Sequence, residues 1–171
     1  MDSKLSTPLL EQVSLSSPFG PLQAALFRGK LCHLSWQQSK DLTGWAQAHR
    51  FNLKKISKAP LKLQREMDRY FQGRLKKFQF PTVFLSGTAF EKKVWNTLKK
   101  IPYGDVRSYQ WVANKIGKPK AVRAVGQANG KNCLPIVIPC HRVISSGGGL
   151  GGYSGGVGMK KKLLELEGVE M

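Results

Sequence analysis

The chain has 171 residues, which is enough for one large domain or two small ones with a buried core. Hydrophobic residues make up 41% and charged residues 22%, and this composition excludes a disordered chain. Twenty-eight Lys and Arg against ten Asp and Glu give a net charge of +18, which predicts a polyanionic partner, nucleic acid first, although composition does not separate DNA from RNA or an acidic membrane.

The first half of the chain predicts a small sheet with a helix. Residues 19–36 indicate a β-hairpin, because two apolar runs flank the turn Arg28-Gly29-Lys30. From Leu61 to Leu75, apolar residues recur at helical spacing. Residues 80–87 are typical of a connector. We therefore predict an α/β domain over residues 1–86 and a second domain over residues 87–171.

The second half predicts mainly helices. Thr88 and Glu91 form a capping box, T-x-x-E, which is expected to begin a helix. The sequence Pro102-Tyr103-Gly104 is expected to end it.

Two further short helices fit a helix-turn-helix motif. Ser108 can cap a helix over residues 109–116, and Gly117 can stop it. A second helix is expected from about Pro119 to Asn129, with Gly130 as its stop. Many helical hairpins share this pattern, so the motif is weak evidence for DNA binding on its own.

The last part of the chain surrounds a cysteine with unusual neighbours. Leu134 to Ile138 is a brief apolar run that we predict to be extended and buried. It leads into Pro139-Cys140-His141-Arg142-Val143, and then into residues 145–158, of which eight of fourteen are glycine. A last short helix, which carries Met159, Leu163, Leu164 and Leu166, is expected to end at Gly168.

Cysteine usage favours a reducing compartment. The three cysteines are an odd number, and the N-terminus shows no secretory signal, which predicts free thiols. We expect a protein of the cytoplasm, or of the nucleus in a eukaryote, that is not secreted and has no membrane span. Cys133, Cys140 and His141 lack the spacing of zinc ligands, so neither a metal nor a cofactor is expected.

Cys140 is the candidate nucleophile. A thiol reacts as its thiolate, and a neighbouring base or positive charge lowers the thiol pKa. His141 is the base by type, but adjacent side chains point apart, so a bridging water would be needed. Glu167 is the best candidate by type to orient the histidine. The alternative is that Cys140 is a small buried hydrophobe.

Two other features could serve a flat ligand and DNA. The glycine-rich loop could wrap a ligand closely, or be a linker or a phosphate cradle, although it lacks the spacing of a P-loop. Arg123 lies among small residues on the second helix of the predicted helix-turn-helix. Small residues let a helix approach a groove, and the cation could enter the base stack. The alternative is an ordinary exposed arginine.

The segment Ile138-Pro-Cys-His-Arg-Val143 resembles the active-site motif of the O6-alkylguanine-DNA alkyltransferases, which are direct-reversal DNA repair proteins. Further matching segments follow in the expected order: FEKKVW, IPYGDVRSY, KAVRAVGQANGKN, GGYSGG and LLELEG. The first half resembles the family only through SPFGPL and the hairpin. The resemblance implies an RNase-H-like α/β N-terminal domain followed by a mostly α C-terminal domain with a winged-helix-like helix-turn-helix.

The resemblance also implies a reaction and its residues. A monomer would flip an O6-alkylguanine, and also an O4-alkylthymine, out of double-stranded DNA and transfer the alkyl group irreversibly and stoichiometrically to Cys140. The implied catalytic residues are Cys140, His141, Glu167, the hinge residue Asn132, and Tyr109, which donates to the guanine ring. The implied DNA contacts are Arg123, Ala121, Ala124, Tyr109 and Gln110. The implied pocket residues are Val143, Gly151, Tyr153, Ser154 and Lys160.

The sequence departs from the family pattern at one position, and two other functions are alternatives to alkyl transfer. Cys133 stands where the family commonly has proline, which predicts a less rigid loop before the active site. A Cys-His hydrolase such as a peptidase would need an oxyanion hole and a peptide cleft. A non-catalytic DNA-binding module that recognises damage would carry an unreactive Cys140.

Overall fold

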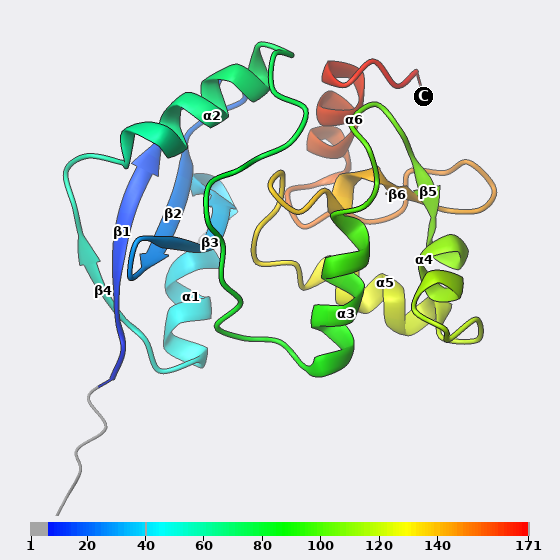
Figure 1. The fold of residues 1–171 in the computed structure, drawn as a ribbon, viewed down its shortest axis with the longest axis horizontal. Helices are drawn as coiled ribbons and strands as arrows, with labels where there is room; N and C mark the ends of the chain where they lie inside the picture. Colours follow the sequence, from blue (N-terminus) through cyan, green and yellow to red (C-terminus); the bar gives the residue numbers. More distant parts are fainter. Residues whose placement is uncertain (1–6, 40, 171) are drawn as a thin grey trace, which may run out of the picture. The chain divides into compact units, whose positions relative to one another are not determined.

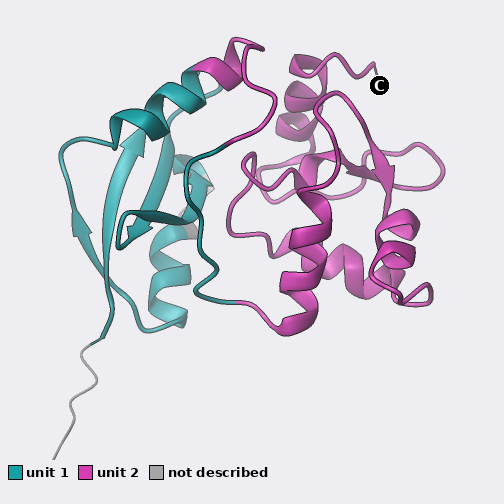
Figure 2. Ribbon diagram, in the orientation of Figure 1, with its two compact units in different colours: residues 1–68, 79–86 teal, residues 69–78, 87–171 magenta. Residues whose placement is uncertain are grey.

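The computed structural model describes residues 7–39 and 41–170. These residues form a mixed α/β fold with a four-stranded sheet, a two-stranded sheet and six α-helices (Figure 1). The chain divides into unit 1, residues 1–68 and 79–86, and unit 2, residues 69–78 and 87–171 (Figure 2). Residues 69–78 therefore belong to unit 2, although they lie inside the stretch expected to form the first domain.

Unit 1 is built on a four-stranded sheet of order β3-β2-β1-β4. Strand β2 pairs antiparallel with both β1 and β3, and β4 pairs parallel with β1. The strands are β1 (Leu9–Leu15), β2 (Leu22–Phe27), β3 (Lys30–Trp36) and β4 (Asn52–Lys55). The predicted hairpin is confirmed as β2 and β3. Its turn places Arg28 and Gly29 at φ 49° and 75°, the two left-handed positions that a two-residue hairpin turn requires.

The helices of unit 1 complete its core. The 3-10 turn η1 (Gln37–Ser39) precedes α1 (Asp41–Ala48), which contacts β3, β4 and β2. Buried Leu10, Ala25, Cys32 and Leu42 form one apolar cluster, so Cys32 is a core residue.

Helix α2 (Leu61–Phe71) buries Leu63 and Met67 and ends earlier than the predicted Leu75. Gly73 follows it with φ +69°, which stops the helix. The Glu66 side chain accepts hydrogen bonds from the backbone N–H groups of Gln79 and Phe80, at 2.9 and 3.0 Å. This carboxylate therefore ties the connector to the helix.

Unit 2 carries the remaining elements. In chain order they are α3 (Ala89–Leu98), β5 (Arg107–Ser108), α4 (Tyr109–Lys115), α5 (Val122–Gly130), the 3-10 turn η2 (Cys140–Arg142), β6 (Val143–Ile144) and α6 (Val157–Leu166). The capping box of Thr88 and Glu91 is confirmed at the start of α3. Ser108 Oγ accepts from Trp111 N and caps α4, also as predicted. Strands β5 and β6 pair in parallel.

Two local predictions in unit 2 were wrong. Gly130 is the last residue of α5 and does not adopt a left-handed stop, and the cap falls on Lys131. The run Leu134 to Ile138 is almost entirely buried, but it forms turns instead of a strand. Ile138 N bonds Leu134 O at 2.8 Å, and Ile136 has φ +73°. Local hydrogen bonds thus replace the pairing that an extended run would need. None of the described helices is long and apolar enough to cross a membrane.

Candidate active site

Cys140 opens the turn η2 and is almost completely shielded, with 1% of its surface exposed. Burial raises the pKa of its thiol to about 11, although Asn132 and the Lys160 ammonium oppose the rise. The expectation that neighbouring groups lower this pKa below its ordinary value is therefore wrong, because burial outweighs them. At neutral pH the thiol keeps its proton, and a base has to remove that proton before sulfur can act as a nucleophile.

His141 supplies a base in the correct protonation state. Its Nε2 lies 2.7 Å from Glu167 Oε1, and an ionised carboxylate only accepts, so Nε2 carries the proton. The other ring nitrogen, Nδ1, is buried and has no hydrogen-bond partner among residues 7–39 and 41–170. Burial lowers the pKa of His141, against the pull of Glu167, so the imidazole is neutral and Nδ1 presents a lone pair.

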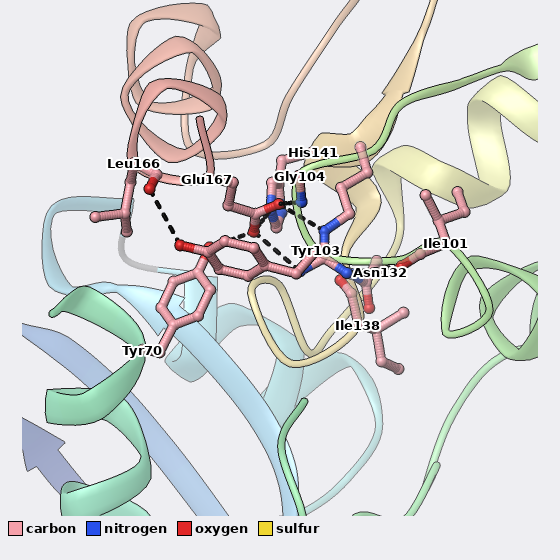
Figure 3. A network of polar contacts seen from close by, with 10 residues as sticks. Tyr70, Ile101, Tyr103, Gly104, Asn132, Ile138, His141, Leu166 and Glu167 are labelled. Carbon is pink, nitrogen blue, oxygen red and sulfur yellow. Dashed lines mark hydrogen bonds and ion pairs between the residues drawn. The ribbon is translucent and has the colours of Figure 1, made fainter. Parts of the chain in front are cut away.

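Glu167 is the C-cap residue of α6, and its buried carboxylate is surrounded by donors (Figure 3). Oε1 accepts from Tyr70 Oη at 2.7 Å, His141 Nε2 at 2.7 Å and Arg142 Nη2 at 2.9 Å. Oε2 accepts from Arg142 Nε at 2.8 Å and Gly104 N at 3.2 Å. Burial opposes ionisation of Glu167, but the hydrogen bonds from His141 and Arg142 outweigh it and hold its pKa at about 2.

Sequence reasoning brought Cys140, His141 and Glu167 forward but missed three partners of the carboxylate. Arg142 donates to both Glu167 oxygens and also to Ile101 O at 2.7 Å, so it fixes the plane of the carboxylate. Tyr70 lies on the apolar face of α2, where the pattern indicated only a core residue. Gly104 donates through its backbone, and a backbone donor leaves no signal in a side-chain pattern.

Asn132 closes the loop that precedes Cys140. Its Nδ2 donates to Ile138 O at 2.9 Å, and its Oδ1 accepts from Leu134 N at 3.0 Å. One side chain thus holds both ends of the turn that contains Ile136. Asn129, on α5, donates to Cys140 O at 3.3 Å and links that helix to the nucleophile; sequence reasoning did not single it out.

Tyr109, the first residue of α4, faces the glycine-rich loop. A Cβ added at Gly151, which has φ +68°, would lie 2.8 Å from Tyr109 Oη. Only glycine therefore lets the loop approach the phenol this closely. Burial and the nearby Cys140 raise the pKa of Tyr109, so it stays protonated and can donate.

Lys160 anchors the other end of the glycine-rich loop from α6. Its Nζ is buried and donates to Val143 O at 2.5 Å and to Gly152 O at 3.4 Å. Burial lowers its pKa to about 8. Of the other expected pocket residues, Tyr153 is half-buried and Ser154 is exposed on the loop.

The helix pair α4 and α5 presents the expected DNA-contacting residues. Arg123 and Ala124 are exposed near the start of α5, and Ala121 is half-buried. Gln110 Nε2 instead donates to Asn114 Oδ1 at 3.0 Å and to Pro119 O at 2.9 Å. Gln110 therefore braces the turn between the two helices.

Comparison with known proteins places this arrangement in a family. Residues 89–169 match the model of the 6-O-methylguanine DNA methyltransferase DNA-binding domain. A methylated-DNA–protein-cysteine methyltransferase of Methanosarcina acetivorans is 40% identical over 156 residues, covering 89% of this chain and 94% of the relative. A crystal structure of Mycobacterium tuberculosis OGT in complex with DNA superimposes with a TM-score of 0.83 at 38% identity, covering 92% of each chain. A crystal structure of the O6-methylguanine-DNA methyltransferase from Pyrococcus kodakaraensis strain KOD1 gives a TM-score of 0.73 at 28% identity, covering 94% of this chain and 99% of that one. The chain belongs to the methylated-DNA–protein-cysteine methyltransferase family.

Proposed function

We propose that this protein repairs DNA by direct reversal, moving the alkyl group of an O6-alkylguanine, and also of an O4-alkylthymine, onto Cys140. The observation that carries the proposal is the buried thiol next to a neutral His141, whose Nε2 is bound to Glu167 and whose Nδ1 is left with a lone pair. Family membership supports the same chemistry. The transfer is irreversible and stoichiometric, and each monomer acts once.

The proton path begins at the thiol. Nδ1 of His141 takes the Cys140 proton through one water, because adjacent side chains do not meet directly. Glu167 then stabilises the imidazolium, and Arg142 keeps the carboxylate ionised.

The thiolate attacks the alkyl carbon in line. A sulfur–carbon bond forms, the bond from carbon to O6 breaks, and its electron pair goes to guanine. Tyr109 donates a proton to the guanine ring and becomes a phenolate, which takes a proton back from solvent. The imidazolium of His141 releases to solvent the proton that it took from Cys140, so the net change is one proton moved from the thiol to guanine. The products are a thioether on Cys140 and unmodified guanine. A thioether has no good leaving group, which is why the protein does not turn over.

The pocket and the DNA surface complete the proposal. Val143, Gly151, Tyr153, Ser154 and Lys160 surround the flipped base, and Asn132 keeps the loop before Cys140 in place. Arg123 fills the gap that the base leaves, with Ala121 and Ala124 allowing close approach to the groove and with Gln110 bracing the helix pair. We also propose that unit 1 is RNase-H-like, that α4 and α5 are winged-helix-like, and that residues 1–86 and 87–171 act as domains.

Intact-mass spectrometry tests this function. Wild-type protein and a Cys140→Ala variant are incubated with a duplex that carries O6-methylguanine. We expect a gain of one methyl group, mapped to Cys140 and saturating at one per wild-type molecule, and no gain on the variant. Wild-type protein that binds the duplex but gains no mass would contradict the proposal and favour a damage-sensing module.

A further inference from the structure

The polar cluster is the group of donors around the Glu167 carboxylate, and Tyr70 is one of its members. Tyr70 lies in none of the sequence segments that resemble the alkyltransferase family. It lies near the end of α2, and its ring is fully buried and meets the rings of Phe71 and Tyr103 at steep angles of 75° and 82°. Its hydroxyl donates to Glu167 Oε1 at 2.7 Å (Figure 3). Packing alone needs no hydroxyl here, and a phenylalanine would fill the same space. The hydroxyl therefore has a role beyond packing.

That role follows from which oxygen Tyr70 binds. Oε1 is the oxygen that accepts from His141 Nε2, so the phenol and the imidazole share one acceptor. A donor on a carboxylate oxygen draws charge toward itself and leaves less to attract a second donor. Among the described residues, the charged and titratable groups around this pair are Arg142, Lys160, Cys140, Tyr103 and Tyr153. Arg142 acts on both oxygens, whereas Tyr70 acts on Oε1 alone.

We propose that Tyr70 is a positioning residue that acts through Glu167: its hydroxyl fixes Oε1 and limits how strongly the carboxylate holds a second proton on His141. The inference rests on the proposed function, because a histidine that keeps its second proton cannot take one from Cys140. Tyr70 touches neither the base nor the thiol in this role.

The sign of the effect can be worked out. Without the hydroxyl, Oε1 keeps more negative charge for His141, the imidazolium is stabilised, and the pKa of His141 rises. The imidazole is then still protonated at a pH where the wild-type ring is neutral. The acid limb of the alkyl-transfer rate therefore moves to higher pH.

The first measurement is a titration of the His141 ring, and it does not depend on alkyl transfer. The chain has only three histidines, so 15N-histidine labelling gives a simple spectrum in which the His141 ring can be titrated. We expect Tyr70→Phe to raise the pKa of His141 by about half a unit or more. Tyr103→Phe is the matched control, because it removes a neighbouring phenol hydroxyl that donates to the Leu166 backbone at 3.1 Å. This control should leave the pKa of His141 unchanged.

The second measurement is single-turnover alkyl transfer against pH. Tyr70→Phe should shift the acid limb upward by the same amount as the titration, which lowers the rate about threefold on that limb for half a unit. Tyr70→3-fluorotyrosine keeps the shape of the side chain and donates more strongly, so it should shift both readings downward. This isosteric variant keeps the test decisive even where Tyr70→Phe does not fold.

The outcomes separate the two proposals. Equal His141 titrations in wild-type protein and in the folded Tyr70 variants would overturn the role of Tyr70. So would a uniform loss of rate without a pH shift, because that is what a purely structural residue would cause. Wild-type protein that transfers no alkyl group would instead overturn the proposed function, while the titration would still report on the hydrogen bond.

Discussion

Cys140 is protected by the same burial that shapes its pocket. A thiol with a pKa of about 11 is protonated at physiological pH, so its resting reactivity is low. Reaction then depends on a base that is already in place, and on a substrate that brings the alkyl carbon to the sulfur. The site therefore discriminates against stray electrophiles through the protonation state of the thiol.

Alkylation by iodoacetamide in the absence of DNA checks this behaviour. The rate constant for Cys140, followed by peptide mapping, should rise about tenfold per pH unit from pH 7 toward 10, because the thiolate fraction grows in that proportion below a pKa of about 11. Free N-acetylcysteine, measured in parallel, should level off earlier. A plateau for Cys140 near pH 8 would contradict the high pKa.

Glu167 should also matter for stability. Its folded-state pKa, about 2, lies below the ordinary value of 4.5. The ionised carboxylate therefore stabilises the fold above pH 4.5, and this contribution is lost as the pH falls toward 2. Glu167→Gln leaves Arg142 buried without its counter-ion, and we expect it to cost about 3 kcal/mol at pH 7.

Urea unfolding at pH 7 and pH 3 provides the comparison. The gap between the unfolding free energies of wild-type protein and Glu167→Gln should narrow at pH 3, which lies between the two pKa values of Glu167. There the unfolded chain binds a proton that the folded carboxylate does not, and this favours unfolding of the wild type alone. An equal gap at both values would show that ionisation of Glu167 does not stabilise the fold.

Sequence reasoning reached the residues that carry recognisable chemistry but not those that support them. Cys140 and His141 stand together in a motif, and Glu167 was chosen by type from a distant helix. Tyr70 was indistinguishable from the other large side chains on the apolar face of α2. Its contact with Glu167 spans 97 residues of sequence, and no local pattern contains that information.

At the scale of structural elements, the close approach of the glycine-rich loop to Tyr109 predicts the effect of one substitution. Gly151→Ala places a methyl group against the Tyr109 hydroxyl and forces a side chain into φ +68°. We expect single-turnover transfer to slow about tenfold or more because Tyr109 is displaced, whereas stability should fall by only about 1 kcal/mol.

Gly152→Ala is the matched control for this loop. The neighbouring position has nothing within 4 Å of an added Cβ, and its φ is not left-handed. Its transfer rate and unfolding midpoint should stay close to wild type. Equal losses in the two variants would mean that loop flexibility, and not contact with Tyr109, limits the reaction.

Helices and strands whose ends are marked by a capping side chain or a tight turn were predictable from the sequence, and those without such a marker were not. Thr88, Glu91 and Ser108 cap helices through their side chains, and the turn at Gly29 shapes the hairpin, so α3, α4, β2 and β3 were found. Strands β1 and β4 and helix α1 were missed. Strand β4 has only four residues, mostly exposed, and takes its structure from pairing with β1.

The charge of the whole molecule predicts how binding responds to salt. With a net charge of +18, association with duplex DNA should weaken steeply as salt rises, because each neutralised phosphate releases counterions. Exposed Lys120, just before α5, is the test residue for a phosphate contact. Lys120→Ala should reduce the slope of log affinity against log salt by about one.

Fluorescence anisotropy at several salt concentrations measures that slope. Glu170→Gln changes the charge by one in the opposite sense at an exposed position and serves as the control. An unchanged slope for Lys120→Ala would remove this lysine from the phosphate-contacting surface.

Helix α2 begins in unit 1 and ends in unit 2, and this shared element bears on how the protein folds. Unit 2 cannot complete its polar cluster from residues 87–171 alone, because it needs Tyr70 from earlier in the chain. Closing a loop of that length carries an entropic cost before the contact repays it, so the cluster should form late, after local helices and the hairpin. The polar cluster around Glu167 would then be among the last parts of the molecule to assemble. A partly folded chain would hold Cys140 and His141 without the Tyr70 contact that completes this cluster.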